Sequence, residues 1–511
     1  MADESAATGR DPVSNRPQLL TYPDSLGGTL AELIALLRGP LDGLFGGVHV
    51  LPPYPSTGDR GFAPITYDRI DPRFGTWADI EDLARTHEVV LDVMVNHISR
   101  RSPEFEAFSR EGPTSLAADL FITPEKIWPA GPPPADDLAR LFLRRRSGPF
   151  STFIAGDGSE VTIWTTFGDD GMSEQIDLDL RTSAARELIE RTLSGLASHA
   201  VSTVRLDAVG YVVKKPGTSS FMVEPEIYDF LDWVTDVAGS FGMAVLPEIH
   251  DRYSTHQALA ARGHWTYDFV LPALLLYALE THDTGRLVSH LMQSPAKQVT
   301  VLDCHDGIPI QPDLTGVLTV DELRWLTNLV EQRGGNVNRI LSPSHAQDGL
   351  DVHQLNCTYY SAVGADDDAY LTARAIQLFA RGVPQIYYVG LLAGGNDYAA
   401  VAATGEGRAI NRHDFAVDEF ESSMRRPVVE RTLDLIRLRN SHPAFGGALA
   451  VSTDVGGALV MTWRKGDAWC ELRADLAARE VTISSRQPGE DARTTAIASP
   501  HGGSIHRSSV S

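Results

Sequence analysis

Cysteine is scarce in this sequence, and a long apolar run is absent. The 511 residues include 3 cysteines, Cys304, Cys357 and Cys470, and no two of them have the spacing of zinc ligands. Such sparse cysteine use is typical of a reducing compartment. No apolar run approaches the roughly 20 residues that span a bilayer. The polar stretch 1–16 lacks the apolar core of a signal peptide, so we expect a disordered leader and a cytoplasmic protein.

Positive charge is also in short supply. The chain has 44 Lys and Arg against 67 Asp and Glu, which gives a formal net charge of −23. Such an acidic surface repels nucleic acid and anionic membranes, so we expect neither as a partner. An anionic substrate would have to be bound by a local cluster of positive charge.

Short apolar runs alternate with stretches of helical periodicity along most of the chain. Strands that alternate with helices predict βαβ units and a parallel sheet. The predicted strands are 18–22, 46–51, 88–95, 201–206, 244–246, 267–271, 299–302 and 383–388. Eight such units favour an α/β fold of the (β/α)8 TIM barrel type over a doubly wound sheet, because no Gly-rich dinucleotide loop follows the first strand.

Two long segments interrupt the alternation, and short alternating strands end the chain. We predict a barrel over 17–96, 176–305 and 365–443, an inserted domain B over 97–175, an inserted domain B' over 306–364 and a C-terminal β domain over 444–511. Both insertions leave from the C-terminal ends of barrel strands, where the active sites of such barrels lie. Both are therefore expected to cover the site.

The fourth predicted strand ends in the sequence VRLDAVGY at 204–211. Residues i and i+2 of a strand point to the same face, so Arg205 and Asp207 should lie together. A neighbouring arginine lowers the pKa of a carboxylate and keeps it ionised, as a covalent nucleophile requires. A purely structural ion pair would give the same local pattern.

Three other predicted strands also end in ionisable residues. These ends are DVMVNH at 92–97, LPEIH at 246–250 and LDCHD at 302–306. The four ends, in this order, resemble the signature regions of the α-amylase family of retaining glycoside hydrolases and transglucosidases. The resemblance narrows to sucrose phosphorylases and their close relatives through three further segments: 351–360, 382–390 and 407–413.

This resemblance, which covers 19–445, implies a double displacement in which inorganic phosphate is the final acceptor. It makes Asp207 the nucleophile, Glu248 the general acid/base and Asp306 the third carboxylate, which binds sugar hydroxyls and distorts the ring. Retaining enzymes hold the first two carboxyls about 5–5.5 Å apart. The apolar neighbours of Glu248 should raise its pKa, so that it keeps its proton.

The resemblance also assigns the binding residues. The residues that it places around glucose are Asp59, Phe62, His97, Phe167, Arg205 and His305. Asp351 and Gln354 match positions that meet the sugars in the acceptor step. Arg145, Tyr211 and Arg408 match positions that meet inorganic phosphate, and Arg408 belongs to the sugar-binding set as well.

Two positions depart from plain sucrose phosphorylases, which usually carry proline in place of Arg144 and tyrosine in place of His353. Relatives acting on sucrose 6'-phosphate carry arginine and histidine there. A guanidinium binds phosphate oxygens with two parallel hydrogen bonds, so both residues are expected to bind a 6-phosphate on fructose. They could also hold a carboxylate, as in relatives acting on glucosylglycerate. Which arginine of 144–146 contacts phosphate stays open, because 143–149 offers no internal anchor for the alignment.

We therefore expect phosphorolysis of sucrose 6'-phosphate to α-D-glucose 1-phosphate and D-fructose 6-phosphate. The alternatives are a sucrose phosphorylase, a glucosylglycerate phosphorylase and, more remotely, an α-glucoside hydrolase or a non-catalytic amylase-like scaffold. Scaffolds usually lose a catalytic carboxylate, and none is missing here. The sequence shows no metal motif, so no metal and no other cofactor is expected. The expected partners are a sugar phosphate and inorganic phosphate, in a monomer or homodimer.

Overall fold

Parallel strands form the centre of the fold. The computed structural model describes residues 13–168, 171–342 and 349–498. Its main sheet has 8 strands in the order β10-β11-β15-β1-β2-β3-β8-β9, and the two end strands contact each other, so the barrel is nearly closed. The strands are β1 (Gln18–Thr21), β2 (Gly47–Val50), β3 (Glu88–Met94), β8 (Thr203–Asp207), β9 (Ala244–Pro247), β10 (Thr266–Asp268), β11 (Gln298–Thr300) and β15 (Val383–Tyr387). The predicted fold class is confirmed.

One predicted strand runs too far. Residues 267–271 were expected to be extended, but β10 ends at Asp268 and helix α9 (Leu271–Thr281) follows. The Leu271 amide donates to Asp268 Oδ1 at 3.0 Å, and Pro272 lies in the first turn. A carboxylate that accepts from a helical amide and a proline in the first turn both favour a helix start.

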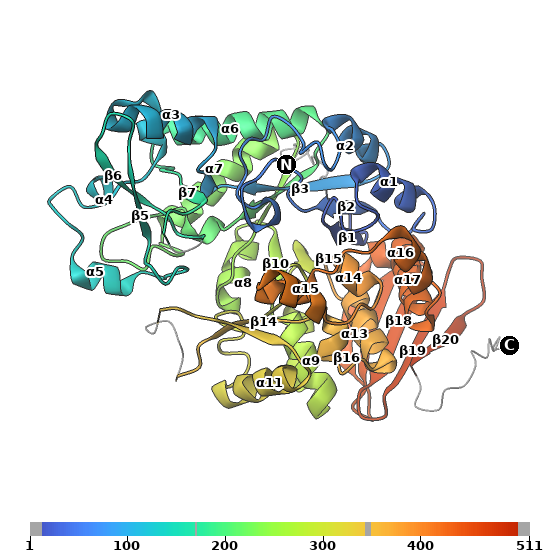
Figure 1. Ribbon diagram of the computed structural model, residues 1–511. Coiled ribbons are helices and arrows are strands. Elements are labelled where there is room, and N and C mark those ends of the chain that lie inside the picture. The colour runs from blue at the N-terminus through green and yellow to red at the C-terminus, as the bar shows by residue number, and fades with distance from the viewer. Residues whose placement is uncertain (1–12, 169–170, 343–348, 499–511) are drawn as a thin grey trace, which may run out of the picture.

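Helices surround the barrel (Figure 1). The longer ones are α1 (Leu30–Arg38), α2 (Trp77–Ala84), α6 (Ser183–Ser198), α7 (Glu226–Ser240), α8 (Tyr253–Ala261), α10 (Gly285–Gln293), α13 (Asp367–Phe379) and α17 (Pro427–Ser441). Helix α6 shows why they form. Thr182 accepts from the Ala185 amide at its start, and Ile189, Leu193 and Leu196 lie buried on one face. A capped start and an apolar stripe of this period stabilise a helix against a sheet.

Shorter helices complete the fold. They are α12 (Tyr359–Ala362), α14 (Tyr388–Leu391), α15 (Tyr398–Thr404) and α16 (Val417–Ser423), with the short 3-10 helices η1 (Asp59–Gly61), η2 (Gly112–Thr114), η3 (Leu116–Leu120), η4 (Val209–Tyr211), η6 (Gly407–Asn411) and η7 (Pro443–Gly446). Within the described ranges, no helix has both the length and the apolar character that a bilayer crossing requires.

Two excursions leave the barrel where domain B and domain B' were predicted (Figure 1, teal at the left and yellow below). The first contains β4 (His97–Ser99), α3 (Pro103–Glu111), α4 (Pro124–Ile127), α5 (Ala135–Arg140), β5 (Phe150–Ile154), β6 (Glu160–Trp164) and β7 (Gln175–Asp177). The second contains β12 (Ile308–Pro309), α11 (Val320–Gln332), β13 (Asn336–Arg339) and β14 (Val352–Asn356). Because β4 pairs with β7, the first excursion begins and ends at the same point of the barrel.

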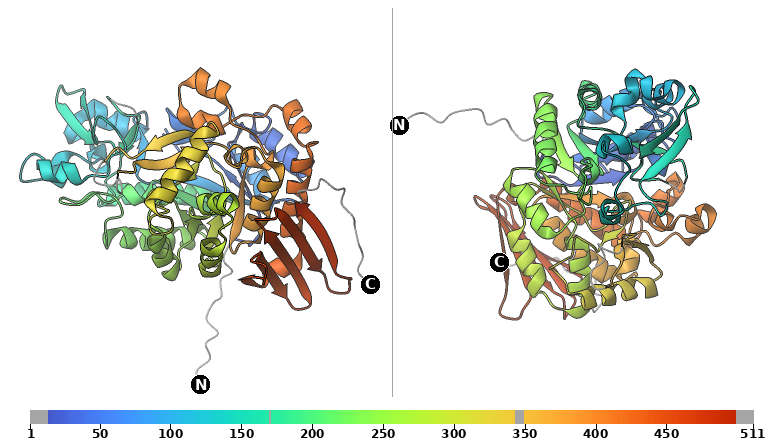
Figure 2. Two further views of the ribbon diagram at one scale, coloured as in Figure 1. Left: turned by 90° about the horizontal axis from the view of Figure 1, so that it is seen from below. Right: turned by 90° about the vertical axis from the view of Figure 1, so that its left-hand side faces the viewer.

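The chain ends in a 5-stranded antiparallel sheet that forms a layer of its own beside the barrel (Figure 2). Its strands are β16 (Ala448–Thr453), β17 (Leu459–Lys465), β18 (Ala468–Asp475), β19 (Glu480–Arg486) and β20 (Arg493–Ala498). Trp463 Nε1 donates to Phe379 O at 2.8 Å and so joins this sheet to the end of α13. The predicted C-terminal β pattern is confirmed within 448–498; residues 499–511 lie outside the described residues.

The N-terminal end of the described chain is held against the barrel. Residues 1–12 of the predicted leader lie outside the described residues. The Ser14 amide lies 3.1 Å from Glu88 Oε2, Asn15 Nδ2 donates to Phe445 O at 2.8 Å, and Arg16 Nε donates to Asn440 Oδ1 at 2.7 Å. The hydrogen-bonded part of the chain therefore begins before residue 17.

A buried ammonium group joins the first excursion to the barrel. Lys214 Nζ lies 2.7 Å from Asp177 Oδ2, donates to Asn96 Oδ1 at 2.8 Å and also donates to Tyr211 O. Asp177 closes the first excursion, Asn96 follows β3, and Tyr211 follows β8. One cation therefore connects three segments, and its charge is balanced by a carboxylate that is as deeply buried as itself.

We expect Lys214→Met to lower the free energy of unfolding by roughly 3–5 kcal/mol, because it leaves the buried Asp177 carboxylate without its cation. Urea unfolding measures the loss. Lys215→Met is the matched control, since Lys215 pairs with Glu226 at the surface and its loss should change stability by only about 0.5 kcal/mol. Equal losses in the two variants would contradict this account of Lys214.

Candidate active site

The end of β8 carries a buried arginine that contacts three carboxylates. Arg205 Nη1 donates to Asp92 and lies 3.2 Å from Asp207 Oδ1, and its Nη2 lies 2.5 Å from Glu248 Oε1. Strand register explains the convergence. Asp92 pairs with Arg205 between β3 and β8, and Arg205 pairs with Leu246 between β8 and β9, so Glu248 follows two residues later on the same side. The predicted nucleophile and acid/base thus meet at one guanidinium.

The proton affinities of the pair are the reverse of the predicted order. Burial and the charge of Glu248 raise the pKa of Asp207 well above its usual range, although Arg205 opposes them. Burial also favours neutral Glu248, but Arg205 and His250 outweigh it and lower the pKa of Glu248 to about 2. The sequence places Arg205 beside Asp207. It does not show that Arg205 Nη2 lies closer to Glu248 than Arg205 Nη1 lies to Asp207. Burial and the charges around the pair thus favour the neutral form of Asp207 and the ionised form of Glu248.

A second charged cluster lies after β11. Arg408 Nη1 donates to Asp306 Oδ1 at 2.8 Å, and its Nη2 lies 3.2 Å from both carboxylate oxygens of Asp59. Arg412 lies 3.6 Å from each of the two carboxylates. Burial raises the pKa of Asp306, but His305, Arg408 and Arg412 outweigh it and lower that pKa well below its usual range. Asp306 is therefore ionised, and Arg408, expected at phosphate, is held by two carboxylates expected at glucose.

The aromatic and imidazole side chains expected around glucose lie together. The rings of Phe62 and His305 stack with centroids 5.1 Å apart, and the Arg205 guanidinium carbon lies 5.6 Å from the Phe62 centroid. His97 Nε2 lies 2.9 Å from Phe62 O, and its ring centroid lies 5.6 Å from that of Phe167. Burial lowers the pKa of His305 to about 4 and also lowers that of His97, so both rings are neutral at pH 7.

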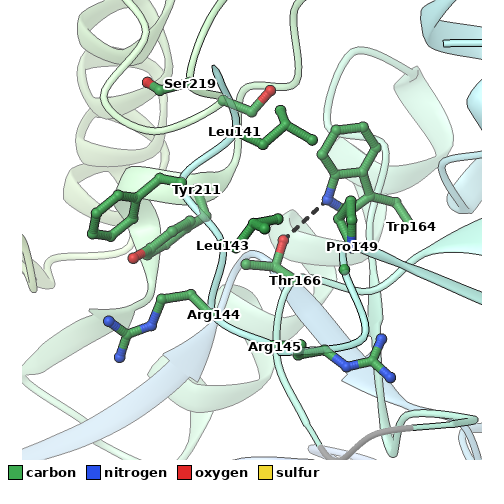
Figure 3. A pocket seen from close by; sticks show the side chains of 12 residues that line it. Leu141, Leu143, Arg144, Arg145, Pro149, Trp164, Thr166, Tyr211 and Ser219 are labelled. Carbon is green, nitrogen blue, oxygen red and sulfur yellow. Dashed lines mark hydrogen bonds between the residues drawn. The ribbon is translucent and has the colours of Figure 1, made fainter. Parts of the chain in front are cut away.

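Arg144 is the predicted phosphate-binding arginine that lies beside Tyr211 and His353. Its guanidinium carbon lies 5.8 Å from the centroid of Phe167. Figure 3 shows Arg144 on the same side of the pocket as the Tyr211 hydroxyl. Burial raises the pKa of Tyr211 to about 12, against the nearby Arg144 charge, and burial together with Arg144 lowers the pKa of His353 to about 3. His353 Nδ1 lies 2.7 Å from Gln311 O.

Arg145 points the other way (Figure 3). Its side chain is 3% exposed, Nη1 donates to Ser151 Oγ at 3.2 Å, and Nη2 donates to Gly171 O at 2.7 Å. These groups all belong to the first excursion. The structure therefore does not bring Arg145 to Tyr211 and His353, although the sequence resemblance expects it at the phosphate.

The two residues expected at the acceptor sugars have different surroundings. Gln354 is buried in β14, directly after His353. Asp351 is 43% exposed, and its Oδ1 lies 2.5 Å from Arg339 Nη1. The structure thus places Gln354 with His353 on one strand and Asp351 in a surface ion pair.

His250 is a site residue for which the sequence predicted no role. Its Nε2 lies 3.7 Å from Glu248 Oε1, and its Nδ1 lies 3.3 Å from Asp313 Oδ2. Burial opposes protonation, but Asp313 and Glu248 raise the pKa of His250 to about 10, so the ring is an imidazolium at neutral pH. The available signal was its position two residues after Glu248 at a strand end. Arg412, Lys214 and Asp313 were also missed, and no local pattern marks them.

Cys304, His305 and Asp306 are the one group in the described ranges whose ligand atoms lie within 4.8 Å of one another in a way that suits a metal ion. Burial raises the pKa of the Cys304 thiol to about 12, which disfavours the thiolate that metals bind. Asp306 Oδ1 already lies close to the guanidinium groups of two arginines, Arg408 and Arg412. The donor set is thus poorly suited to a cation.

Known proteins resemble this chain along most of its length. Residues 45–262 match the family model for the alpha amylase catalytic domain. The chain is 49% identical to a sucrose 6(F)-phosphate phosphorylase of Thermoanaerobacterium thermosaccharolyticum, over 92% of this chain and 97% of that protein. It is 40% identical to a glucosylglycerol phosphorylase of Marinobacter adhaerens and to a sucrose phosphorylase of Streptococcus mutans, with the same coverage in each case.

A solved structure with the same fold carries the same enzyme name as the first of these relatives. The crystal structure of sucrose 6F-phosphate phosphorylase from Thermoanaerobacter thermosaccharolyticum superposes with a TM-score of 0.92 at 46% identity, and covers 98% of this chain and 100% of that chain. The resemblance predicted from the sequence is confirmed.

The raised pKa of Asp207 predicts how Asp207→Asn changes stability with pH. An acid whose pKa is higher in the folded protein than in the unfolded chain destabilises the fold progressively as the pH rises above the unfolded-chain pKa, by about 1.4 kcal/mol per pKa unit up to the folded pKa. Asparagine resembles the protonated side chain and avoids this cost. We expect Asp207→Asn to be more stable than the wild type at neutral pH, and the difference to vanish below the ordinary aspartate pKa of about 3.9. Urea midpoints at both pH values measure it, and a pH-independent difference would contradict the assignment.

Proposed function

This chain belongs to the glycoside phosphorylases of the α-amylase family, and on that premise we propose that it cleaves sucrose 6'-phosphate with inorganic phosphate. The products are α-D-glucose 1-phosphate and D-fructose 6-phosphate. The observation that carries the proposal is that Arg144, from the first excursion, lies beside both Tyr211 and His353, the latter from the second excursion. The 49% identity to a protein named for this activity supports it.

In the first step Asp207 attacks the anomeric carbon of glucose while Glu248 protonates the leaving oxygen of fructose 6-phosphate. This requires the charge on Asp207 and the proton on Glu248. Arg205 contacts both carboxylates, so a proton that moves from one to the other leaves the net charge beside the guanidinium unchanged. The raised pKa of Asp207 belongs to the coupled pair and does not remove Asp207 as nucleophile.

In the second step an oxygen of inorganic phosphate attacks the same carbon. The bond between that carbon and Asp207 breaks, its electron pair returns to the carboxylate, and Glu248 takes the phosphate proton. Two displacements at one carbon restore the α configuration. The ionised carboxylates of Asp306 and Asp59 suit the glucose hydroxyls as acceptors, and Phe62 on His305 offers an apolar wall.

The acceptor end is suited to a phosphate ester. Arg144 offers a planar set of donors that matches phosphate oxygens. His353 donates from Nδ1 to Gln311 O, so its Nε2 is an acceptor while the ring is neutral. A phosphate dianion at Nε2 would raise the pKa of His353 and draw a proton onto that nitrogen.

The domain bounds, the assembly state and the location of the protein are further parts of the proposal. We propose the division into barrel, domain B (97–175), domain B' (306–364) and C-terminal domain with the predicted bounds, and a monomer or homodimer. The three cysteines are free, which supports a reducing location such as the cytoplasm.

A substrate panel tests the function. Sucrose, sucrose 6'-phosphate, glucosylglycerol and glucosylglycerate are each supplied with inorganic phosphate, and α-glucose 1-phosphate and free glucose are both measured. We expect the highest kcat/KM with sucrose 6'-phosphate, and glucose 1-phosphate that depends on added phosphate. A preference for an unphosphorylated donor would refute the acceptor assignment, and free glucose as the main product would favour a hydrolase.

The double variant Arg144→Pro with His353→Tyr should move the preference toward sucrose. Hydrogen bonds to charged groups are worth about 1.5–3 kcal/mol each, so kcat/KM for sucrose 6'-phosphate should fall about a hundredfold or more while that for sucrose changes much less. Arg146→Ala is the control, because Arg146 is exposed on the same loop. An unchanged preference in the double variant would show that Arg144 and His353 do not bind the substrate phosphate.

A further inference from the structure

A line of buried ionisable groups connects the second excursion to Glu248. Asp313 lies just after β12 with a fully buried side chain. Its Oδ2 lies 3.3 Å from His250 Nδ1, and its Oδ1 lies 3.8 Å from His256 Nε2. His250 Nε2 in turn lies 3.7 Å from Glu248 Oε1. A residue of the second excursion thus reaches the acid/base through one imidazole ring.

The His250 ring is held by aromatic contacts as well as by Asp313. It stacks on Phe269 with centroids 4.2 Å apart and meets the His353 ring edge-on at 5.7 Å. The groups of opposite charge at its two nitrogens are Asp313 and Glu248, while His353 beside it is neutral. A ring with a carboxylate at each nitrogen is favoured as the imidazolium, because each nitrogen then donates a proton toward a negative charge.

We propose that Asp313 is a positioning residue for the phosphate step: it holds His250 by Nδ1 and so fixes an Nε2–H donor with its positive charge beside Glu248. This inference rests on the proposed function. It adds a residue that influences the phosphate step without being one of the reacting groups. Asp313 touches neither Asp207 nor Glu248 and acts through the ring.

The physical reason lies in the charge of the acceptor. Inorganic phosphate is an anion, and it must approach the carboxylate of Glu248 to give up its proton. Two negative charges in a buried site repel each other strongly, and a fixed cation between them reduces that repulsion. A water molecule that attacks the same glucosyl-enzyme carries no charge and gains far less from the cation. The contribution of Asp313 should therefore depend on the charge of the acceptor.

The test compares Asp313→Asn with the wild type, using sucrose 6'-phosphate as donor with and without inorganic phosphate. Asparagine keeps the shape of the side chain and removes its charge. We expect kcat/KM for phosphate to fall about tenfold, the size of one pKa unit of lost interaction, while hydrolysis of the donor changes much less. The alkaline limb of phosphorolysis should also move to lower pH, because His250 without Asp313 loses its proton at lower pH.

Asp268→Asn is the matched control. Asp268 is also buried and contacts a histidine, with His290 Nε2 2.9 Å from both of its oxygens, but that histidine packs against Tyr253, with ring centroids 4.9 Å apart. We expect it to lower stability without changing the ratio of phosphorolysis to hydrolysis. If Asp313→Asn fails to fold, His250→Gln provides the second test and should shift the same ratio in the same direction.

Failure of the proposed function and failure of this inference alone give different results. A wild type that releases no glucose 1-phosphate would overturn the proposed function and this inference with it. A wild type that phosphorolyses normally, beside an Asp313→Asn variant with an unchanged ratio and pH profile, would overturn the inference alone.

Discussion

Asp92, Asp207 and Glu248 bring three carboxyls to one buried end of the barrel, and Arg205 is the cation that they share. A buried charge without a partner costs several kcal/mol, so this cluster is stable only while the guanidinium contacts its neighbours. The contacts follow from strand register, because β3, β8 and β9 are adjacent. Closing the barrel therefore also sets how far apart the carboxyls of Asp207 and Glu248 lie, the pair that we propose as nucleophile and acid/base.

Different parts of the chain supply the side chains for bond cleavage and those that select the acceptor in the proposed reaction. The barrel supplies the Arg205 cluster and the carboxylates that we propose bind glucose, while Arg144 and His353 lie on the two excursions. Relatives named for sucrose, glucosylglycerol and sucrose 6(F)-phosphate align over the same span of this chain, so one overall fold serves all three. In a chain with a net charge of −23, Arg144 and the His250 imidazolium supply local positive charge at the phosphate site that we propose.

The sequence predicted the barrel well because buried parallel strands are continuous apolar runs, and the carboxylates that we propose as catalytic follow the ends of such strands. The sixth strand was predicted to extend too far. Asp268 caps the helix that follows through a contact between its side chain and a backbone amide, which the pattern of apolar residues does not show. The proton order of Asp207 and Glu248 could not be predicted, because it depends on which nitrogen of Arg205 lies nearer. Contacts between distant segments, such as His250 with Asp313, leave no periodic signal in a single sequence.

The central claim is that Asp207 forms a covalent glucosyl-enzyme, and trapping it in a Glu248→Gln variant tests that claim directly. α-Glucosyl fluoride serves as donor, because fluoride leaves without protonation, whereas water attacks the intermediate slowly when no general base is present. Mass spectrometry of a digest should find one hexose unit on the peptide that contains Asp207, and added phosphate should release it as α-glucose 1-phosphate. A hexose on another residue, or none at all, would contradict the account.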